Sequence, residues 1–497
     1  MTTITSGPGA ETPGLRSRLA AARAANPIPS VVVIVLAGVY VAAGAAAVFD
    51  GLSSDVLIGI LGVTFAAALA VLAYERFWWF LMVLLVSRAA LDGIRSSASQ
   101  AGQLDPSTIV GAVFLVVGAG WLVVQWRAGL WSKVSRTTKV FAIFAGLLLI
   151  SAFGAHNMKD SLVACSRILS VVILIAVFEQ VFRKDPERIN GALVAIFASM
   201  IVPIVVGYVQ VIQNPSNLKA ANENLSRIRA TFVHPNAFAT YLVLVTLLAV
   251  GMYPHVSVKW RRAFMALIVA AAPLIVLTYA RGAWIGLVLG LFFLGFVQSP
   301  RLVVFLLIGI IVVVIAVPSV ASRLGDLNRG KSKPIGTRGA SISSTVTAKV
   351  EPDSLTWRVD YWGRVIPLIG QNPVTGIGLE MVREVTPEHE PPHNVYVQTL
   401  VEGGIAGFTA FILLLLTLVF DLRNAWRRAR KGLPYGLTIA VIAAAICVFV
   451  ELFTENLLAE IALLWYFFVP IAWVVSVVGR PGPVPRDMSH VEIEAHA

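Results

Sequence analysis

The chain has 497 residues, of which 57% are apolar and 13% are charged. Soluble proteins carry about twice that fraction of charge, so the composition excludes an ordinary soluble protein. The formal net charge of +12 could suit a nucleic-acid-binding protein, but the basic residues occur in short clusters between apolar runs and form no continuous basic stretch. We therefore expect a lipid bilayer, and no nucleic acid, around this chain.

Apolar runs follow one another from Pro29 to Val478, and each is long enough to cross a hydrocarbon core of about 30 Å. The pattern predicts an all-α polytopic membrane protein with about 12–14 transmembrane helices. The N-terminal residues 1–28 contain arginines but no apolar stretch, so we expect a disordered cytoplasmic segment there and no removable signal peptide. The expected spans are 30–49, 56–73, 77–93, 108–126, 139–155, 161–182, 191–213, 231–253, 263–279, 282–298, 302–320, 394–420, 434–452 and 457–478.

The basic residues fall on alternate connections between these spans. Lys and Arg are retained on the cytoplasmic side of short loops, so the basic connections are assigned to the cytoplasm. They run from Arg127 to Lys139, from Arg183 to Arg188, from Lys259 to Arg262 and from Arg423 to Lys431. The other connections then face outward, and among them is the long segment 321–393.

The long outward loop separates a first transmembrane bundle, 29–320, from the final transmembrane helices, 394–478, which a cytoplasmic tail, 479–497, follows. Residues 325–354 are rich in Gly, Ser, Thr and Lys, which predicts a flexible flap. The following stretch places Trp357, Tyr361, Val365 and Leu368 at helical spacing, so we expect an amphipathic helix at the outer interface.

Three arginines are assigned to the outward side. Arg229 begins the span RATFVHPNAFATYL, Arg281 lies in the short turn of LTYARGAWIGL, and Arg358 belongs to the long loop. A guanidinium group binds phosphate oxygens through two parallel hydrogen bonds and stays charged at any relevant pH, so together these three could hold a diphosphate. Alternatively, each arginine reaches lipid phosphate or pairs with a carboxylate.

His393 has the chemistry of a general base, or of a group that holds an acceptor hydroxyl, and Asn394 is placed to cap the next helix. A hydrogen bond from His393 to a loop carbonyl is the competing interpretation. His389 and His234 are weaker candidates of the same kind.

Five carboxylates are candidates for ion-pair partners or catalytic groups: Asp360, Glu380, Glu402, Glu451 and Glu455. Glu402, inside the span that follows His393, is expected to pair with an outward arginine, because an unpaired carboxylate there would be costly. Glu451 and Glu455 are expected to be exposed at the last outward hairpin. The glycines of VEGGIAGF indicate close helix packing or a break in the helix.

Metal and nucleotide sites have little support in the sequence. Cys165 and Cys447 both lie inside apolar runs, the histidines lack metal-ligand spacing, and no Walker-type phosphate loop occurs. We expect no cofactor and no metal.

Four motifs in the second half of the chain occur in a recognisable order: RATFVHPNAFATYL, LTYARGAWIGL, W-R-x-x-Y-W with NPVTGIGLE, and HNVYVQTLVEGGIAGF. Together they resemble the O-antigen ligase and polymerase family of membrane glycosyltransferases. The resemblance implies a GT-C-like, all-helical enzyme that moves a glycan from a polyprenyl-diphosphate carrier to a glycan, lipid or protein acceptor outside the cytoplasmic membrane. It implies neither a metal nor a cofactor, and transfer with inversion.

Carried over to this sequence, the resemblance implies that Arg229, Arg281 and Arg358 neutralise the diphosphate and that His393 activates the acceptor. Residues of the same motifs are expected to contact substrate: His234, Asn236, Asn394, Tyr361, Trp362 and Glu402. The family includes ligases and polymerases, and both remain open, as does a transporter or flippase that binds a lipid-linked sugar with the same arginines. A purely structural scaffold is a further alternative. This chain departs from the family pattern in two ways: its flap is long, and it has about fourteen expected spans where the family commonly has about twelve.

Overall fold

A computed structural model of the chain describes residues 69–92, 106–213, 227–301, 304, 308–309 and 355–479. Several predicted segments lie outside these ranges. They are the N-terminal segment, the flap 325–354, nearly all of the tail, and all or most of the spans 30–49, 56–73 and 302–320. All regular elements within them are helices, which confirms the all-α prediction.

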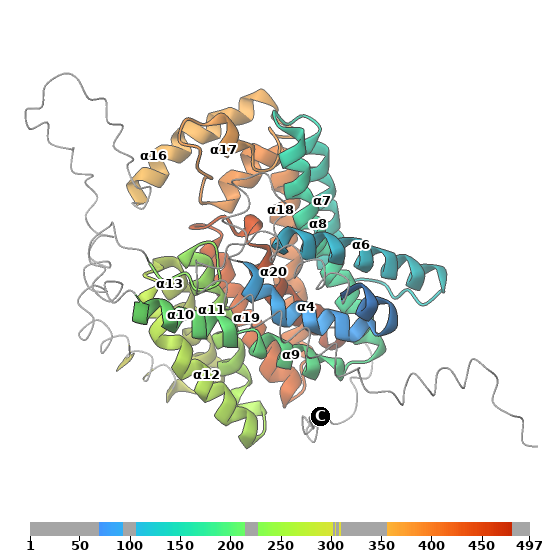
Figure 1. The fold of residues 1–497 in the computed structure, drawn as a ribbon, viewed down its shortest axis with the longest axis vertical. Coiled ribbons are helices and arrows are strands. Elements are labelled where there is room, and N and C mark those ends of the chain that lie inside the picture. Colours follow the sequence, from blue (N-terminus) through green and yellow to red (C-terminus); the bar gives the residue numbers. More distant parts are fainter. Residues whose placement is uncertain are drawn as a thin grey trace, which may run out of the picture.

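The helices follow one another along the chain, and Figure 1 shows their arrangement. They are α4 (Phe77–Leu91), α6 (Pro106–Arg127), α7 (Arg136–Ala152), α8 (Met158–Lys184), α9 (Arg188–Ala198), α10 (Ile201–Gln213), α11 (Pro235–Met252), α12 (Val258–Leu277), α13 (Arg281–Gln298), α16 (Leu355–Val365), α17 (Met381–Val385), α18 (Val395–Arg428), α19 (Leu433–Glu451) and α20 (Ile461–Trp473). Short 3-10 segments are η4 (Tyr253–His255), η5 (Ile366–Gln371) and η6 (Leu457–Ala459), and a π-helical turn, η7 (Val474–Val478), continues α20.

In the described ranges, nine helical segments are long and apolar enough to cross a membrane. These segments confirm a polytopic membrane protein. Helices α9 and α10 together form one segment, Arg188–Gln213, which corresponds to the predicted span 191–213. The segments are Val110–Arg127, Met158–Lys184, Arg188–Gln213, Pro235–His255, Val258–Leu277, Arg281–Gln298, Gly404–Arg428, Leu433–Glu451 and Ile461–Val478. The predicted span 77–93 corresponds to the shorter apolar helix α4, and 139–155 to α7.

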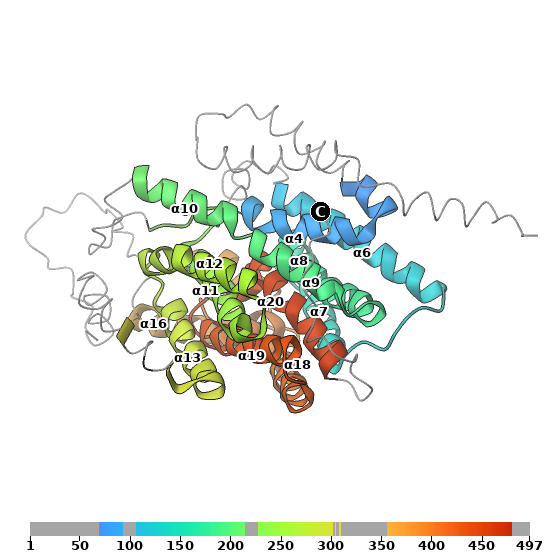
Figure 2. The same cartoon turned by 90° about the horizontal axis from the view of Figure 1, so that it is seen from below.

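The last helix is the core of the bundle. In the segment Ile461–Val478, 94% of residues are buried, and α20 contacts α4, α8, α9, α11 and α19 (Figure 2). A helix that is apolar on every side, with Trp465 and Trp473 among its residues, is stable only when it is surrounded. By contrast α6 projects from the bundle and only 17% of its span is buried, so its apolar side chains are left for lipid.

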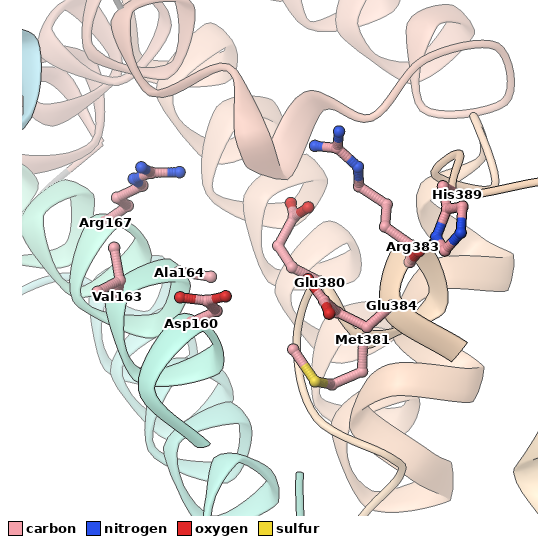
Figure 3. A pocket seen from close by; sticks show the side chains of 9 residues that line it. All are labelled: Asp160, Val163, Ala164, Arg167, Glu380, Met381, Arg383, Glu384 and His389. Carbon is pink, nitrogen blue, oxygen red and sulfur yellow. Dashed lines mark hydrogen bonds between the residues drawn. The ribbon is translucent and has the colours of Figure 1, made fainter. Parts of the chain in front are cut away.

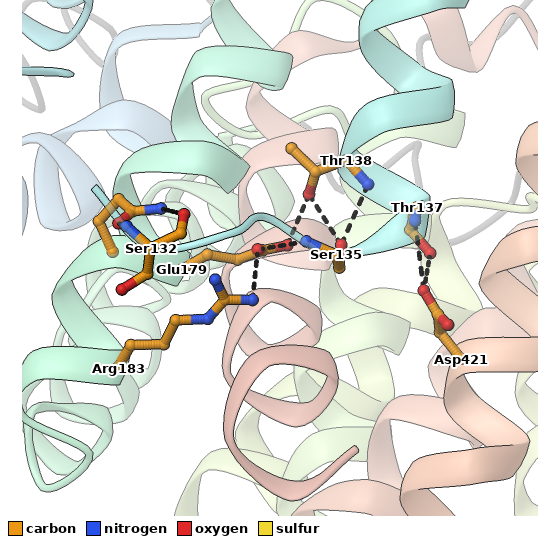
Figure 4. Close-up of polar contacts among 8 residues, drawn as sticks. Ser132, Ser135, Thr137, Thr138, Glu179, Arg183 and Asp421 are labelled. Atoms are coloured by element: carbon orange, nitrogen blue, oxygen red, sulfur yellow. Dashed lines mark hydrogen bonds and ion pairs between the residues drawn. The ribbon is translucent and has the colours of Figure 1, made fainter. Parts of the chain in front are cut away.

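At one end of the bundle, α7 is fastened to α8 and α18 by polar contacts (Figure 4). The fully buried Glu179 accepts hydrogen bonds from Ser135 N at 2.8 Å and Thr138 Oγ1 at 2.6 Å, and it pairs with Arg183 at 3.2 Å. Thr137 Oγ1 donates to Asp421 at 2.9 Å. These contacts hold the start of α7 against α8 and α18.

At the opposite end, α16, η5 and α17 form a small layer over the ends of α8 and α18 (Figure 1). The prediction of a helix with Tyr361 and Val365 on its apolar face is confirmed, because both side chains are fully buried. They pack with Ile377, Met381 and Val382, and with Val397 and Val401 at the start of α18. We call this end of the bundle the loop end.

Helix α18 is broken at Gly404, whose φ is 65° and ψ is −171°. The segment 373–378 lies against the break: Ile377 N and Gly378 N donate to the carbonyls of Val401 and Glu402, at 3.1 and 3.0 Å. In return, Ile405 N donates to Pro373 O at 2.9 Å. A Cβ atom on Gly404 would lie 2.3 Å from Val374 O, so only glycine fits. The predicted single span 394–420 is therefore two pieces, and the membrane-crossing piece begins at Gly404.

Candidate active site

The guanidinium group of Arg358 lies against the turn that follows α19. Its NH1 donates to the carbonyl oxygen of Thr454 at 2.8 Å, and its NH2 lies 3.6 Å from Glu455 Oε1. Helix α16 carries the arginine, and the buried Tyr361 and Val365 on the same helix fix its position. The Arg358 side chain is 13% exposed, so this ion pair is largely shielded from water.

Glu455 is contacted by three segments that are far apart in the sequence. Besides Arg358, Asn236 in the first turn of α11 donates a short hydrogen bond from Nδ2 to Glu455 Oε1. His393 Nδ1 lies 3.9 Å from Oε2 of the same carboxylate. Val395 N donates to Leu452 O at 2.8 Å, which ties the start of α18 to the turn that carries Glu455. Glu455 therefore joins predicted site residues from α11, α16 and the segment before α18.

Arg227 extends this set of contacts to the turn between α12 and α13. Its NH2 donates to Asn236 Oδ1, and its Nε donates to the carbonyl of Thr278 at 2.7 Å. That turn contains Tyr279, with a φ of 54°, and ends at Arg281, the first residue of α13. The arginine predicted in the turn thus lies at the same end of the bundle as Arg358 and His393.

The first turn of α13 also lies directly against Glu451 and Thr454. A Cβ atom on Gly282 would lie 2.7 Å from Thr454 Oγ1 and 3.0 Å from both Glu451 carboxylate oxygens. The expectation that Glu451 is exposed is wrong, because it is 1% exposed. The Thr454 hydroxyl, which lies against the same helix start, donates to Glu451 Oε2 at 3.2 Å. Glu455 is also largely buried, with 14% of its side chain exposed.

Of the two arginines in the segment before α11, the structure places Arg227 rather than Arg229 in this set of contacts. The side chain of Arg229 is exposed, and its backbone N–H donates to Gln210 Oε1 at 3.3 Å. Both arginines lie outside regular helices, two residues apart, and nothing in the sequence distinguishes them. Arg227 is the residue of the site that the sequence did not indicate, and Glu451 and Glu455 are the carboxylates whose burial it did not predict.

The predicted cap at Asn394 is confirmed. Its Oδ1 accepts hydrogen bonds from the backbone N–H groups of Tyr396 at 2.9 Å and Val397 at 3.1 Å. His393, immediately before it, has a φ of 49°, an uncommon value for a residue with a side chain. His234 caps α11 in the same way, accepting from Asn236 N at 3.2 Å, and its side chain is exposed.

Tyr361 and Trp362 hold the segment 386–393, which we call the strap. The Tyr361 hydroxyl donates to Glu390 O and lies 2.9 Å from Thr386 Oγ1, while Trp362 Nε1 donates to Pro392 O at 2.7 Å. Tyr361 is fully buried, and burial raises the pKa of its hydroxyl. Tyr361 and Trp362 therefore position the strap, and His393 at its end. Their expected contact with substrate stays a prediction.

Within the part of the chain that the structure describes, Glu402 forms no ion pair with an arginine, contrary to the expectation. Its Oε1 accepts the backbone N–H of Val382 at 3.0 Å, next to the break in α18, and its side chain is 1% exposed. Burial, and then the negative charge of Glu380, raise the pKa of Glu402 to about 8. The carboxyl group of Glu402 joins α17 to α18 and lies away from the contacts of Glu455.

The site contains several guanidinium groups, one imidazole and two carboxylates at one end of the bundle. In the residues that the structure describes, no three His, Cys, Asp or Glu side chains are arranged to hold a metal ion. The guanidinium groups of Arg358, Arg281 and Arg227 are suited to phosphate oxygens. The imidazole beside Glu455 is suited to proton transfer.

A family model described as O-antigen ligase matches residues 265–412. The matched stretch runs from within α12 to the middle of α18 and contains Arg281, Arg358 and His393, whereas Arg227, Asn236 and Glu455 lie outside it. No curated protein matches the chain. The family match confirms the resemblance seen in the sequence. The apolar helices make the chain a multi-pass membrane protein, and its residues 265–412 match an O-antigen ligase family, which implies glycosyltransferase-like activity.

The raised pKa of Glu402 predicts a fall in stability with increasing pH. Between its ordinary value of 4.5 and about 8, the folded state keeps a proton that the unfolded state releases. The free energy of unfolding should then decrease by at most about 1.4 kcal/mol per pH unit across that window and level off above it. The Glu402→Gln variant should lose this slope, as thermal unfolding of the detergent-solubilised chain at pH 6, 7 and 8 would show.

Glu388→Gln is the control, since Glu388 is a partly exposed carboxylate that pairs with Arg364. It should retain the pH dependence of the unmodified chain. An unchanged slope in the Glu402→Gln variant would contradict the assignment of the proton to Glu402.

Proposed function

We propose that this O-antigen ligase-type protein transfers a glycan from a polyprenyl-diphosphate carrier to a hydroxyl group of an acceptor at the outer face of the cytoplasmic membrane. The observation that carries the proposal is the convergence of Arg358, His393 and Asn236 on Glu455. This convergence supports a site in which Arg358 holds the leaving diphosphate and His393 accepts the proton of the incoming hydroxyl.

The leaving group sets the first requirement. When the bond between the anomeric carbon and the diphosphate oxygen breaks, negative charge develops on the diphosphate. Positioned guanidinium groups in a site with little water stabilise that charge. Arg358 and Arg281 are proposed to bind it, with Arg227 held behind Asn236. The 3.6 Å separation between Arg358 and Glu455 is longer than a direct hydrogen bond, so a diphosphate can compete for this guanidinium.

The acceptor sets the second requirement. Its hydroxyl oxygen forms the new bond to the anomeric carbon, and His393 takes the proton. Glu455 Oε2, which faces His393 Nδ1, orients the imidazole and stabilises the imidazolium that forms. Direct attack from the side opposite the diphosphate gives inversion. In this scheme the arginines supply the positive charge that a metal supplies in other transferases.

The distribution of basic residues supports an outward-facing loop end. Helix α8 runs from the loop end and finishes with Arg183 and Lys184, and the last turn of α18 contains Arg427 and Arg428. Arg261 and Arg262 lie in the first turn of α12, at the same end as these residues. The positive-inside rule assigns that end to the cytoplasm and the loop end to the outside.

The proposed roles of Arg358 and His393 can be tested in proteoliposomes that contain the full chain, a polyprenyl-diphosphate glycan and membranes bearing the acceptor. Arg358→Gln and His393→Ala should each lower the transfer rate at least about 100-fold, because one removes stabilisation of the leaving group and the other removes the base. The measurement is the rate of appearance of the glycan on the acceptor, resolved by mass.

Arg364→Gln is the matched control, because Arg364 lies on the same helix but pairs with Glu388 on the exposed side. Its transfer rate should stay within about twofold of the unmodified chain. Unaltered transfer in the Arg358 or His393 variant would rule out the proposed role of that residue. Carrier-linked glycan that crosses the bilayer without a new glycosidic bond would show a flippase instead.

The two arginines before α11 give a second prediction. Arg227→Gln should lower transfer at least about tenfold, because it removes the hydrogen bonds that hold Asn236 and the turn before Arg281. Arg229→Gln, which changes an exposed side chain, should have the smaller effect. Transfer rates of the two variants under identical conditions provide the comparison, and the reverse order would contradict the arrangement described here.

A further inference from the structure

A pocket of about 400 Å³ lies between α8 and the layer of α17 (Figure 3). This volume is within the range of roughly 300–1,000 Å³ that small-molecule sites occupy. Asp160, Val163, Ala164 and Arg167 line it from α8, and Glu380, Met381, Arg383, Glu384 and His389 line it from the other side. In Figure 3, Asp160 and Arg167 face Glu380 and Arg383 across the opening.

The lining is polar on both sides, and its charges nearly cancel. Three carboxylates face two guanidinium groups and one imidazole. A diphosphate would meet three negative charges here, so the pocket is unsuited to the leaving group that the contacts around Glu455 suit. Carboxylates accept hydrogen bonds from hydroxyl groups, and guanidinium groups donate to ring and hydroxyl oxygens. This alternation of acceptors and donors is suited to an uncharged, hydroxyl-rich ligand.

The pocket is held in shape by contacts at its base. Asn157 N, at the cap of α8, contacts the sulfur of Met381 at 3.4 Å. A Cβ atom on Gly378 would lie 2.4 Å from Ala155 Cβ, so the two sides approach each other closely just before Glu380. Glu380 itself has a φ of 66°, and its side chain lines the pocket. The two polar faces are therefore fixed relative to each other.

The strap connects the pocket with the contacts around Glu455. His389 lies in the pocket lining and His393 lies beside Glu455, and four residues of chain span at most about 14 Å. Tyr361 and Trp362 hold the strap between them through the carbonyls of Glu390 and Pro392. The pocket and His393 therefore lie close together on the same segment of chain.

We propose that this pocket binds sugar residues of the acceptor and presents a hydroxyl group of that glycan to His393. The proposal rests on the proposed function and adds the class of ligand and its place. Glu380 and Arg383, with Asp160 and Arg167 opposite them, are the residues that recognise the glycan. The diphosphate of the donor is bound separately by the arginines around Glu455.

The test is a pair of binding measurements on the purified full chain. One probe is the oligosaccharide part of the acceptor of the producing cells, released from its anchor. The other is sugar-free polyprenyl diphosphate. Glu380→Gln and Arg383→Gln should weaken oligosaccharide binding at least tenfold and leave polyprenyl diphosphate binding within twofold. Arg358→Gln should show the reverse pattern.

Glu388→Gln serves as the control, because it changes a carboxylate of the strap that does not line the pocket, and thermal unfolding checks that each variant is folded. Oligosaccharide binding that is absent from the unmodified chain, or that survives both pocket variants, overturns the proposal. Equal loss of both probes in the pocket variants overturns it too. Failure of the proposed function would instead appear as no glycan transfer by the unmodified chain, whatever the outcome of the oligosaccharide measurement.

Discussion

Glu455 is the residue on which the arrangement of the proposed site depends. It follows α19, yet its carboxylate is contacted by Arg358 of α16, Asn236 of α11 and, at 3.9 Å, His393 of the strap. A carboxylate with 14% of its side chain exposed needs partners of positive or hydrogen-bonding character. Contacts with Glu455 therefore hold α11, α16 and the strap next to one another. Without a negative charge at this point, the cations and the imidazole would have no common anchor before substrate arrives.

A second constraint acts on the backbone. Gly404 breaks α18, and the segment 373–378 completes the hydrogen bonds that the break leaves open. In a membrane every exposed backbone group needs a partner, so such a break is tolerated only where other protein covers it. The piece of α18 before the break lies at the loop end, and the piece after it is the one long and apolar enough to cross the membrane. The strap and His393 are attached to the first piece and are thereby held at the loop end.

The sequence predicted the helices well, because a bilayer admits few other structures and apolar length is visible directly. It predicted the amphipathic helix of Tyr361 and Val365 and the cap at Asn394 for similar local reasons. It placed Glu451 and Glu402 wrongly, since their surroundings come from distant segments: the start of α13 for one and Val382 for the other. The choice between Arg227 and Arg229, and the importance of Glu455, depended on tertiary contacts that no local pattern contains.

The central claim is that Glu455 holds Arg358 and His393 until the diphosphate of the donor competes for the arginine. The most direct test measures sugar-free polyprenyl diphosphate binding and glycan transfer for the unmodified chain and for Glu455→Gln. The account predicts that the variant binds the diphosphate more tightly, because a competing negative charge is gone, and transfers glycan more slowly, because His393 loses its carboxylate. Weaker diphosphate binding, or transfer at the rate of the unmodified chain, would contradict it.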